Sequence, residues 1–332
     1  MRAAVLHQIN DPLQVVELND PVAQPGGVLV RLRAAALNHR DAWIRKGLYA
    51  RIKLPCVLGS DGAGEVSAVG DGVDPSCIGR RVLVHPSTGW GGDPRAQGKE
   101  FTILGMPEQG TLAEQIAVPV SRVEPLPEHL SFREGAAFSL AGLTAYRALV
   151  TRGEVKSGEH VLITGIGGGV ATLLLVLAKA LGATVSVTSS SEDKLAQARA
   201  LGASHGVNYA AAGWEKELLA QAGRAPSLII DGAGGSGLNQ LVALAAPGAR
   251  IVVYGATRGP PRDLEMPRIF FKQIDLRGST MGSDEEFRAL LALVARQELR
   301  PVIDRVFTLA EAPLALARME ESSQMGKIVV DL

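Results

Sequence analysis

The pattern of apolar and polar positions changes character partway along the chain. Up to about Arg122, short β-branched runs are broken by Gly, Pro, Asn and Asp, as at 28–34, 64–69 and 81–85. Runs of this length bounded by turn residues predict a compact antiparallel β unit. The stretch 123–130 (VEPLPEHL) is rich in proline, which disfavours helix in the residue before it. We therefore expect a domain boundary there.

Beyond residue 159, apolar strands alternate with helical segments. The predicted strands are 161–164, 184–189, 207–209, 228–231 and 250–254, and the predicted helices are 169–181, 192–201 and 238–246. Glycine or a Pro-Gly pair follows each of these helices and ends it. Repeated βα units with apolar strands predict a parallel sheet covered on both faces, which is a doubly wound α/β domain.

The C-terminal part begins with a helix start signal. Ser283, with Glu286 three residues later, is a capping-box pattern that opens an apolar-periodic helix to about Glu298. The last residues, 327–332 (KIVVDL), predict a strand that returns to the first domain. The predicted domains are residues 1–124 completed by 268–332, and residues 125–267.

Composition and charge narrow the class of protein. A chain of 332 residues with 46% hydrophobic and 20% charged residues is expected to fold, as about two domains. Lys plus Arg and Asp plus Glu number 34 each, so no net field favours nucleic acid or an anionic membrane, and a small-molecule partner is expected. No apolar run approaches the length of a membrane span, and the first residues lack a secretory pattern, which makes the cytoplasm the expected location. Two cysteines are too few for a disulfide framework or a four-thiolate zinc site.

A glycine loop links the first predicted parallel strand to its helix. Residues 165–171 (GIGGGVA) follow the strand and open directly into the helix. Glycines let backbone N–H groups approach a pyrophosphate, whose charge is stabilised by the helix N-terminus. This context predicts a dinucleotide site that includes Gly165, Gly168, Gly169 and Val170. The alternative is a loop that needs glycine only for positive φ.

The end of the second parallel strand bears on which dinucleotide binds. An NAD site commonly places Asp or Glu there for the ribose 2′-hydroxyl. This chain has Ser189, Ser190 and Ser191, followed by Lys194. A carboxylate about 4 Å from a phosphate would cost on the order of several kcal/mol at an effective dielectric near 20, so the hydroxyls and the lysine favour NADP(H). The alternative is that Ser191 is a helix cap and Lys194 a solvated charge.

Four segments together resemble the medium-chain dehydrogenase/reductase superfamily. They are 38–41 (NHRD) with 47–49 (GLY) downstream, 59–66 (GSDGAGEV), 140–146 (LAGLTAY) and the glycine loop. Within that superfamily, the chain is most similar to the zinc-free quinone oxidoreductase branch. The resemblance implies a GroES-like β-rich catalytic domain, a Rossmann domain that binds the cofactor, and a homodimer.

The resemblance also bears on metals. In zinc-dependent relatives, the ligand positions match Asn38, Ser60 and Leu140, and none of these is a competent zinc ligand. The segment 87–110 resembles the place of a four-cysteine zinc lobe but contains no cysteine. We therefore expect no metal. An alternative ligand set from residues near strand ends consists of His39, Asp41, Asp61 and His85.

The same resemblance assigns site residues. Asn38 and Tyr49 match a polar pair that lines the nicotinamide and substrate pocket: Asn38 orients the carboxamide or the substrate oxygen, and Tyr49 donates a hydrogen bond or a proton. The further expected cofactor contacts are Thr144 beside the nicotinamide, Tyr209 near the adenosine phosphate, and Gly255 and Thr257 at the end of the fifth strand. The structural alternatives are a turn-forming Asn, a partly buried Tyr, a helix-interior Thr and a sheet-end Tyr.

The expected activity follows from the missing zinc ligands. Alcohol oxidation needs a Lewis acid or an equivalent group to stabilise the developing alkoxide, whereas a conjugated carbonyl accepts the charge of an added hydride itself. The sequence therefore favours NADPH-dependent, zinc-independent reduction of a quinone or an α,β-unsaturated carbonyl. Two alternatives are a zinc-type alcohol dehydrogenase with atypical ligands and a non-catalytic NADPH-binding protein.

Overall fold

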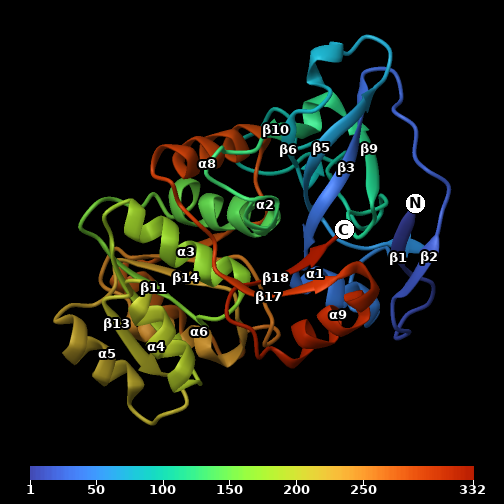
Figure 1. Cartoon of the computed structure of the whole chain (residues 1–332). Helices are drawn as coiled ribbons and strands as arrows, with labels where there is room; N and C mark the ends of the chain where they lie inside the picture. Colours follow the sequence, from blue (N-terminus) through green and yellow to red (C-terminus); the bar gives the residue numbers. More distant parts are fainter. The chain divides into compact units, whose positions relative to one another are not determined.

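The computed structural model describes residues 1–332 (Figure 1). In its β-rich part, strand β3 (Gly27–Ala36) is the central strand to which several others pair. It pairs antiparallel with β5 (Asp61–Val69) and β9 (Gln115–Pro119), and β5 pairs antiparallel with β6 (Arg81–Val84). The even-numbered residues in the first part of β3 are buried in a valine-rich core, as the two-residue period of a strand requires. The predicted antiparallel unit is confirmed.

The end of the chain returns to this sheet. Strand β18 (Lys327–Asp331) pairs antiparallel with β3 and parallel with β17 (Ile303–Thr308). Helix α8 (Asp284–Arg296) starts at Ser283, whose hydroxyl accepts from the Glu286 N–H while the Glu286 carboxylate accepts from the Ser283 N–H. Both the returning strand and the capping box were predicted correctly.

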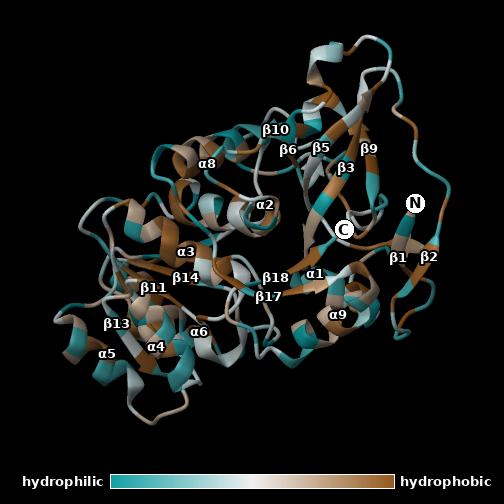
Figure 2. Cartoon of the chain, viewed as in Figure 1, coloured by the Kyte–Doolittle hydropathy of each residue, from teal (hydrophilic) through white to brown (hydrophobic).

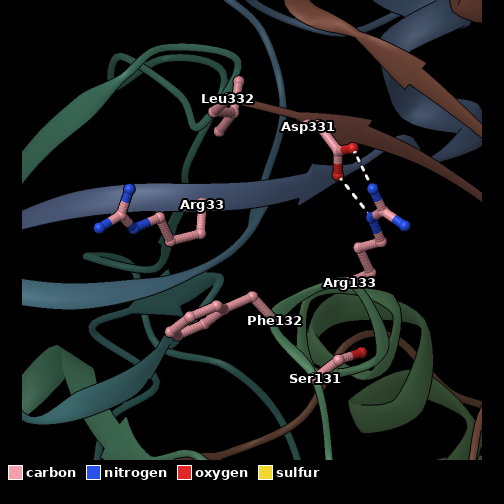
Figure 3. A pocket seen from close by; sticks show the side chains of 6 residues that line it. All are labelled: Arg33, Ser131, Phe132, Arg133, Asp331 and Leu332. Atoms are coloured by element: carbon pink, nitrogen blue, oxygen red, sulfur yellow. Dashed lines mark hydrogen bonds and ion pairs between the residues drawn. The ribbon is translucent and has the colours of Figure 1, made fainter.

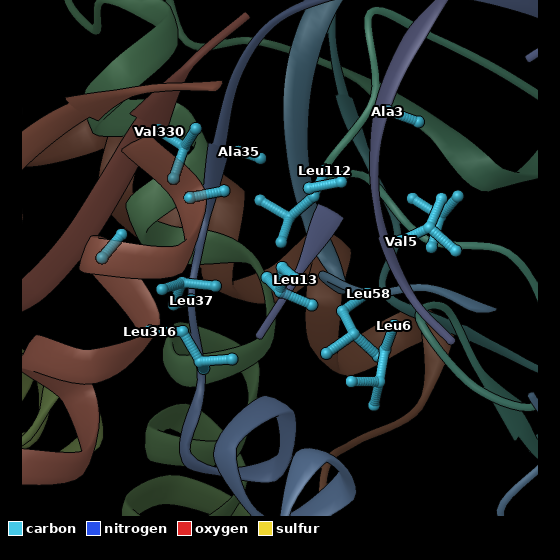
Figure 4. Close-up of a cluster of buried hydrophobic side chains, with 14 of the residues drawn as sticks. Ala3, Val5, Leu6, Leu13, Ala35, Leu37, Leu58, Leu112, Leu316 and Val330 are labelled. Carbon is cyan, nitrogen blue, oxygen red and sulfur yellow. The ribbon is translucent and has the colours of Figure 1, made fainter. Parts of the chain in front are cut away.

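Shorter elements complete the β-rich unit. They are β1 (Arg2–Leu6), β2 (Gln14–Glu17), β4 (Cys56–Val57), β7 (Ser87–Thr88), β8 (Thr102–Ile103), β10 (Val123–Pro125), α1 (His39–Arg45) and α9 (Ala312–Glu321). Between them lies a hydrophobic cluster, in which Figure 4 shows Leu37, Leu58, Leu112 and Val330. Burial of each such leucine contributes roughly 1.5–3 kcal/mol. The cluster holds the end of β3 against β18, and α1 follows β3 directly.

The second part of the chain is a six-stranded parallel sheet in the order β13-β12-β11-β14-β15-β16. Its strands are β11 (His160–Ile163), β12 (Thr184–Ser189), β13 (His205–Asn208), β14 (Leu228–Asp231), β15 (Arg250–Val253) and β16 (Asp275–Gly278). Its helices are α3 (Gly169–Ala180), α4 (Glu192–Ala200), α5 (Trp214–Ala222), α6 (Leu238–Leu244) and α7 (Met266–Lys272). Figure 2 shows apolar residues concentrated in the central strands and in α3, and the predicted doubly wound sheet is confirmed.

The chain divides into two compact units at positions that differ from the predicted ones. The β-rich unit contains residues 1–141 and 282–332, and the parallel-sheet unit contains residues 142–281. The sequence placed the boundaries after 124 and 267. Residues 275–278 instead form β16, which pairs in parallel with β15, so this segment belongs to the parallel sheet. The first division falls within α2 (Phe132–Tyr146), the helix that carries Thr144.

None of the nine helices combines the length and the apolar character that crossing a membrane requires.

Candidate functional site

The glycine loop after β11 exposes the start of α3. Gly165 has φ of +62°, and an added Cβ there would meet no atom within 4 Å, so the backbone angle is what requires glycine at this position. Two bonds hold the loop against β12: the Gly165 N–H donates to Thr188 Oγ1 at 3.1 Å, and the Ile166 N–H donates to the Thr188 carbonyl at 2.7 Å. The positive-φ alternative therefore explains Gly165, and it is compatible with ligand binding.

Helix α3 begins without a side-chain cap. Its N-cap residue is Gly168, and the first regular helical bond runs from the Thr172 N–H to the Gly168 carbonyl. Gly169 and Val170 lie in the first turn, where backbone N–H groups have no acceptor within the helix. A phosphate at this point would receive these hydrogen bonds and the positive end of the helix dipole. The loop therefore fits the pyrophosphate of a dinucleotide.

Two of the predicted cofactor residues meet at the end of β12. The Tyr209 hydroxyl donates to Ser190 Oγ at 3.3 Å, and the Tyr209 N–H donates to the Ser189 carbonyl at 3.0 Å. Ser190 is exposed, whereas Ser189 is buried and its hydroxyl accepts from the Ser191 N–H at 3.1 Å. Ser190 and Tyr209 thus present hydroxyls at this strand end, while Ser189 shapes the turn.

Lys194 lies in the first turn of α4. Ser191 is the N-cap of that helix, and its hydroxyl accepts from the Lys194 N–H at 3.3 Å. The capping alternative for Ser191 is therefore correct. Lys194 is half-buried, and its position on the first turn after the serines is the one that the sequence predicted.

Arg258 is a residue that the sequence reasoning missed. Its guanidinium carbon lies 5.0 Å from the centroid of the Tyr209 ring, a cation–π geometry. Arg258 follows Thr257 in the loop after β15, so the structure brings this loop to the strand end that carries Ser190. The sequence did carry a signal for Arg258, because it is a cation next to Thr257, in the loop where a cofactor contact was already expected.

The remaining predicted cofactor residues have mainly structural contacts. A Cβ added to Gly255 would lie 2.9 Å from the Gly232 carbonyl oxygen, and Thr257 Oγ1 donates to that same oxygen at 3.5 Å. These two residues therefore hold the loops after β14 and β15 together. Thr144 is buried in α2, with 6% of its surface exposed.

Asn38 begins α1 in the β-rich unit. Its N–H donates to Asp41 Oδ2 at 2.8 Å, and the other oxygen of Asp41 accepts from the Gly59 N–H at 3.2 Å. Asp41 is fully buried, and burial is the main cause that raises its pKa above the ordinary value. Asp41 thus fixes the start of the helix against the chain before β5.

The Asn38 side chain belongs to a buried polar network. Its Nδ2 donates to Asp61 Oδ2 at 2.9 Å, and Lys327 Nζ donates to Asn38 Oδ1 at 2.8 Å. Lys327 also pairs with Asp61 Oδ2 at 2.8 Å. Because a carboxylate only accepts and an ammonium only donates, these partners determine the amide orientation. Sequence reasoning missed Lys327, because a single lysine in a predicted strand carries no signal for such a contact.

Tyr49, the second predicted catalytic residue, is held by a different contact. The Arg40 guanidinium carbon lies 5.1 Å from the centroid of the half-buried Tyr49 ring. Arg40 donates to Ser60 Oγ at 2.8 Å and to the carbonyls of Leu104 and Met106 at 2.6 and 2.9 Å. The structure therefore ties Asn38 to Asp61 and Lys327, and Tyr49 to Arg40.

A separate hollow of about 500 Å³ lies on the β-rich unit, and Figure 3 shows the side chains that line it. Its arginines are already neutralised, because Arg133 pairs with Asp331 at 2.5 Å and Arg33 pairs with Glu65 at 2.8 Å. We assign it no ligand. Its lining residues are Arg33, Ser131, Phe132, Arg133, Asp331 and Leu332.

Comparisons with known proteins agree with this geometry. A family described as "Alcohol dehydrogenase GroES-like domain" matches residues 24–128, and one described as "Zinc-binding dehydrogenase" matches residues 169–296. The chain is 40% identical to a protein of Leptosphaeria maculans named "Zinc-type alcohol dehydrogenase-like protein YogA", over 98% of this chain and 96% of that relative. The chain belongs to the medium-chain dehydrogenase/reductase superfamily.

Two further relatives of this dehydrogenase/reductase chain bear on its activity. It is 30% identical to the mouse "Quinone oxidoreductase", over 99% of this chain and 97% of the relative. A crystal structure titled "NAD-dependent alcohol dehydrogenase" has a TM-score of 0.94 and 36% identity, with both chains covered completely. The protein is an oxidoreductase of this superfamily.

The residues of this superfamily member do not fit a catalytic zinc ion. At the three predicted ligand positions, the Asn38 amide bonds Asp61 and Lys327, and the Ser60 hydroxyl bonds Arg40 and the Leu104 carbonyl. Leu140 has no ligating side chain, and its backbone N–H donates to Asp61 Oδ1 at 2.7 Å. A positive charge is already present on Lys327. Residues 1–332 contain no group of three or more His, Cys, Asp and Glu side chains that could hold a metal.

The two histidines of the alternative ligand set are also not grouped for metal binding. Burial, followed by the charge of Lys327, lowers the pKa of His39. Burial likewise lowers the pKa of His85 to about 4, and its ring packs edge-on against Phe287 with centroids 4.6 Å apart.

Proposed function

We propose that the chain is an NADPH-dependent oxidoreductase that reduces quinones or α,β-unsaturated carbonyls without zinc. The observation that carries this proposal is the buried network of Asn38, Asp61 and Lys327, which places an amide donor and a protein-borne cation where zinc-dependent relatives are expected to bind metal. Its similarity to a quinone oxidoreductase supports the same substrate class.

The end of β12 supports NADPH over NADH. The hydroxyls of Ser190 and Tyr209 and the cation of Arg258 are grouped there, with Lys194 on the first turn of α4. The carboxylate that follows in sequence, Glu192, accepts a hydrogen bond from Asn208 Nδ2 at 2.9 Å. Hydroxyl donors and cations are the groups that bind a ribose 2′-phosphate.

The chemistry divides between the cofactor and the chain. A bound reduced nicotinamide supplies the hydride. The chain's Asn38 Nδ2 donates a hydrogen bond to the substrate oxygen that gains negative charge, and the Tyr49 hydroxyl is the proposed proton source. A conjugated carbonyl needs this donor and no base, so the residues present suit reduction of an activated carbon.

Steady-state NADPH oxidation with a panel of quinones and enones tests the proposed function. We expect turnover with at least one acceptor class, with no loss after chelator treatment and no stoichiometric zinc by elemental analysis. About one zinc per chain, with activity lost on chelation, would instead identify a zinc-type alcohol dehydrogenase. Tight NADPH binding with every acceptor inert would identify a non-catalytic binding protein.

Lys194→Ala tests the cofactor preference. We expect the Kd for NADPH to rise about tenfold, equivalent to about 1.4 kcal/mol, while the Kd for NADH changes less than twofold, because only NADPH carries the 2′-phosphate. Fluorescence titration of both cofactors measures the two constants. Lys216→Ala, an exposed lysine on α5, is the matched control and leaves both unchanged. Equal weakening of NADPH and NADH would contradict the phosphate role.

We also propose that the protein forms a homodimer, in which β16 of one copy pairs with β16 of the other. This strand is an edge strand of the parallel sheet. Its Leu276 is 45% exposed, and Phe271 on the preceding helix is 80% exposed. Antiparallel pairing centred on Leu276 would place Asp275 opposite the second copy's Arg277, so the edge is complementary to itself in charge. Pairing would also cover an exposed strand edge.

Leu276→Arg tests this pairing. We expect sedimentation velocity to give a dimer for the unaltered chain and a monomer for the variant, because two like charges would face each other across the two-fold axis. Leu314→Arg, which alters an exposed leucine of α9, is the control and is expected to remain dimeric. A monomeric unaltered chain at micromolar concentration would refute the proposal.

A further inference from the structure

A fully enclosed ammonium group lies beside the proposed oxygen-binding residue. The Lys327 side chain is 2% exposed, and its Nζ donates to the Leu37 carbonyl at 2.7 Å, to Asn38 Oδ1 at 2.8 Å and to Asp61 Oδ2 at 2.8 Å. These three acceptors satisfy all three N–H donors of the ammonium. Removing an ion pair from water is costly, and an apolar pair would fill such a space without that cost. The charge therefore calls for an explanation other than packing.

The network leaves one Nδ2 hydrogen of Asn38 as a donor for a ligand. Its Oδ1 is occupied by the Lys327 ammonium, and one of its two Nδ2 hydrogens is given to Asp61. The hydrogen that remains is a donor, since a primary amide has two N–H donors and one carbonyl acceptor. Asp61 is itself held by the Leu140 N–H at 2.7 Å, so the amide cannot turn without breaking several buried bonds.

The neighbouring charge also strengthens that donor. A cation hydrogen-bonded to an amide oxygen withdraws electron density from the nitrogen, and linked hydrogen bonds in a low-dielectric interior polarise one another. A carbonyl oxygen needs only a donor.

We propose that Lys327 is a positioning residue that locks Asn38 as a polarised donor to the carbonyl oxygen of the acceptor. The inference rests on the proposed function and narrows its substrate class to acceptors whose carbonyl oxygen gains charge. Because all three N–H donors of Lys327 are bonded within the chain, it acts on the substrate only through Asn38.

The test compares the unaltered chain with Lys327→Arg and with the charge-free pair Asp61→Asn/Lys327→Met, which leaves no buried ion without a partner. We expect the pair to lower kcat for an enone or quinone by about tenfold, with the KM for NADPH within twofold, since the donor remains but loses its polarisation. Lys327→Arg, which keeps a cation beside Asn38, is expected to retain most of the kcat of the unaltered chain. Unchanged kcat in the charge-free pair would overturn the inference.

A second readout is independent of turnover. In an ¹⁵N-labelled sample, the Asn38 side-chain amide resonance is assigned by its disappearance in Asn38→Asp. Titration with cyclohexanone, a carbonyl that accepts but does not donate, is expected to move one Nδ2 proton downfield in the unaltered chain and by less than half as much in the charge-free pair. Equal shifts in both proteins, or none in either, would overturn the inference.

The two readouts separate the inference from the proposed function. If no acceptor is turned over but the cyclohexanone shift depends on Lys327, the proposed function fails and the donor assignment stands. If acceptors are turned over at a rate that the charge-free pair does not change, the proposed function stands and the role of Lys327 fails.

Discussion

Replacing Asn38 with Ala is expected to lower kcat for quinone or enone reduction by about 10²–10³-fold, the typical effect of removing one donor to a developing negative charge. The physical reason is that Asn38 Nδ2 is held by Asp61 while Asn38 Oδ1 accepts from Lys327, so the amide is already oriented before substrate arrives. Steady-state kinetics with saturating NADPH measures the loss. The Kd for NADPH is expected to remain within about threefold, because the proposed role of Asn38 is to bind the substrate oxygen and not the cofactor phosphates.

The matched control for this substitution is Asn38→Ser. Asn38 is also the N-cap of α1, and serine is among the favoured N-cap residues, so this variant keeps the helix start while removing the amide. A loss of kcat similar to that of Asn38→Ala would assign the effect to the amide. Retention of more than one third of kcat in Asn38→Ala would contradict a donor role.

Lys327→Met is expected to lower the free energy of unfolding by about 3–5 kcal/mol, because it leaves the Asp61 carboxylate buried with no counter-ion. Asp61 has 0% of its side chain exposed, so water cannot replace the lost partner without opening the core. Urea denaturation followed by fluorescence or circular dichroism measures the change, provided that the transition is evaluated at equal protein concentration.

The double variant Asp61→Asn/Lys327→Met provides the comparison for stability. Removing both charges avoids the unpaired ion, so most of the lost stability is expected to return. A surface pair supplies the scale: Arg33→Met, which breaks the exposed pair with Glu65, is expected to cost less than about 1 kcal/mol. A loss below about 1 kcal/mol in Lys327→Met would mean that the Asp61–Lys327 pair is not energetically important.

Much of the dinucleotide site was predictable because its signals are local. The glycine loop, the strand before it and the helix after it occupy one continuous segment, and the serines and Lys194 follow the next strand directly. Each feature depends on backbone angles, helix caps or hydrophobic period, which neighbouring residues determine. The observed α3, β12 and α4 accordingly lie within one residue of the predicted bounds.

Other features required contacts between distant parts of the chain. Lys327 reaches Asn38 across a separation of 289 residues, and Arg258 reaches Tyr209 from the loop after another strand. Neither side chain has a neighbour in sequence that reveals its partner. The end of the parallel-sheet unit differs from the predicted boundary for the same reason, because β16 is defined by its pairing with β15 and its own short sequence carries no signal for it.

The amino-acid sequence by itself determined the two types of sheet, the glycine loop, the helix caps and the superfamily, since these follow from short-range periodicity, backbone freedom and ordered motifs. Only the tertiary structure decided that Asn38 faces a buried ammonium, that Arg258 lies on Tyr209, and that the last parallel strand belongs to the second unit. The physical reason is that the partner of a buried charge or an edge strand is selected by three-dimensional packing, and many positions along the chain satisfy the same local rules.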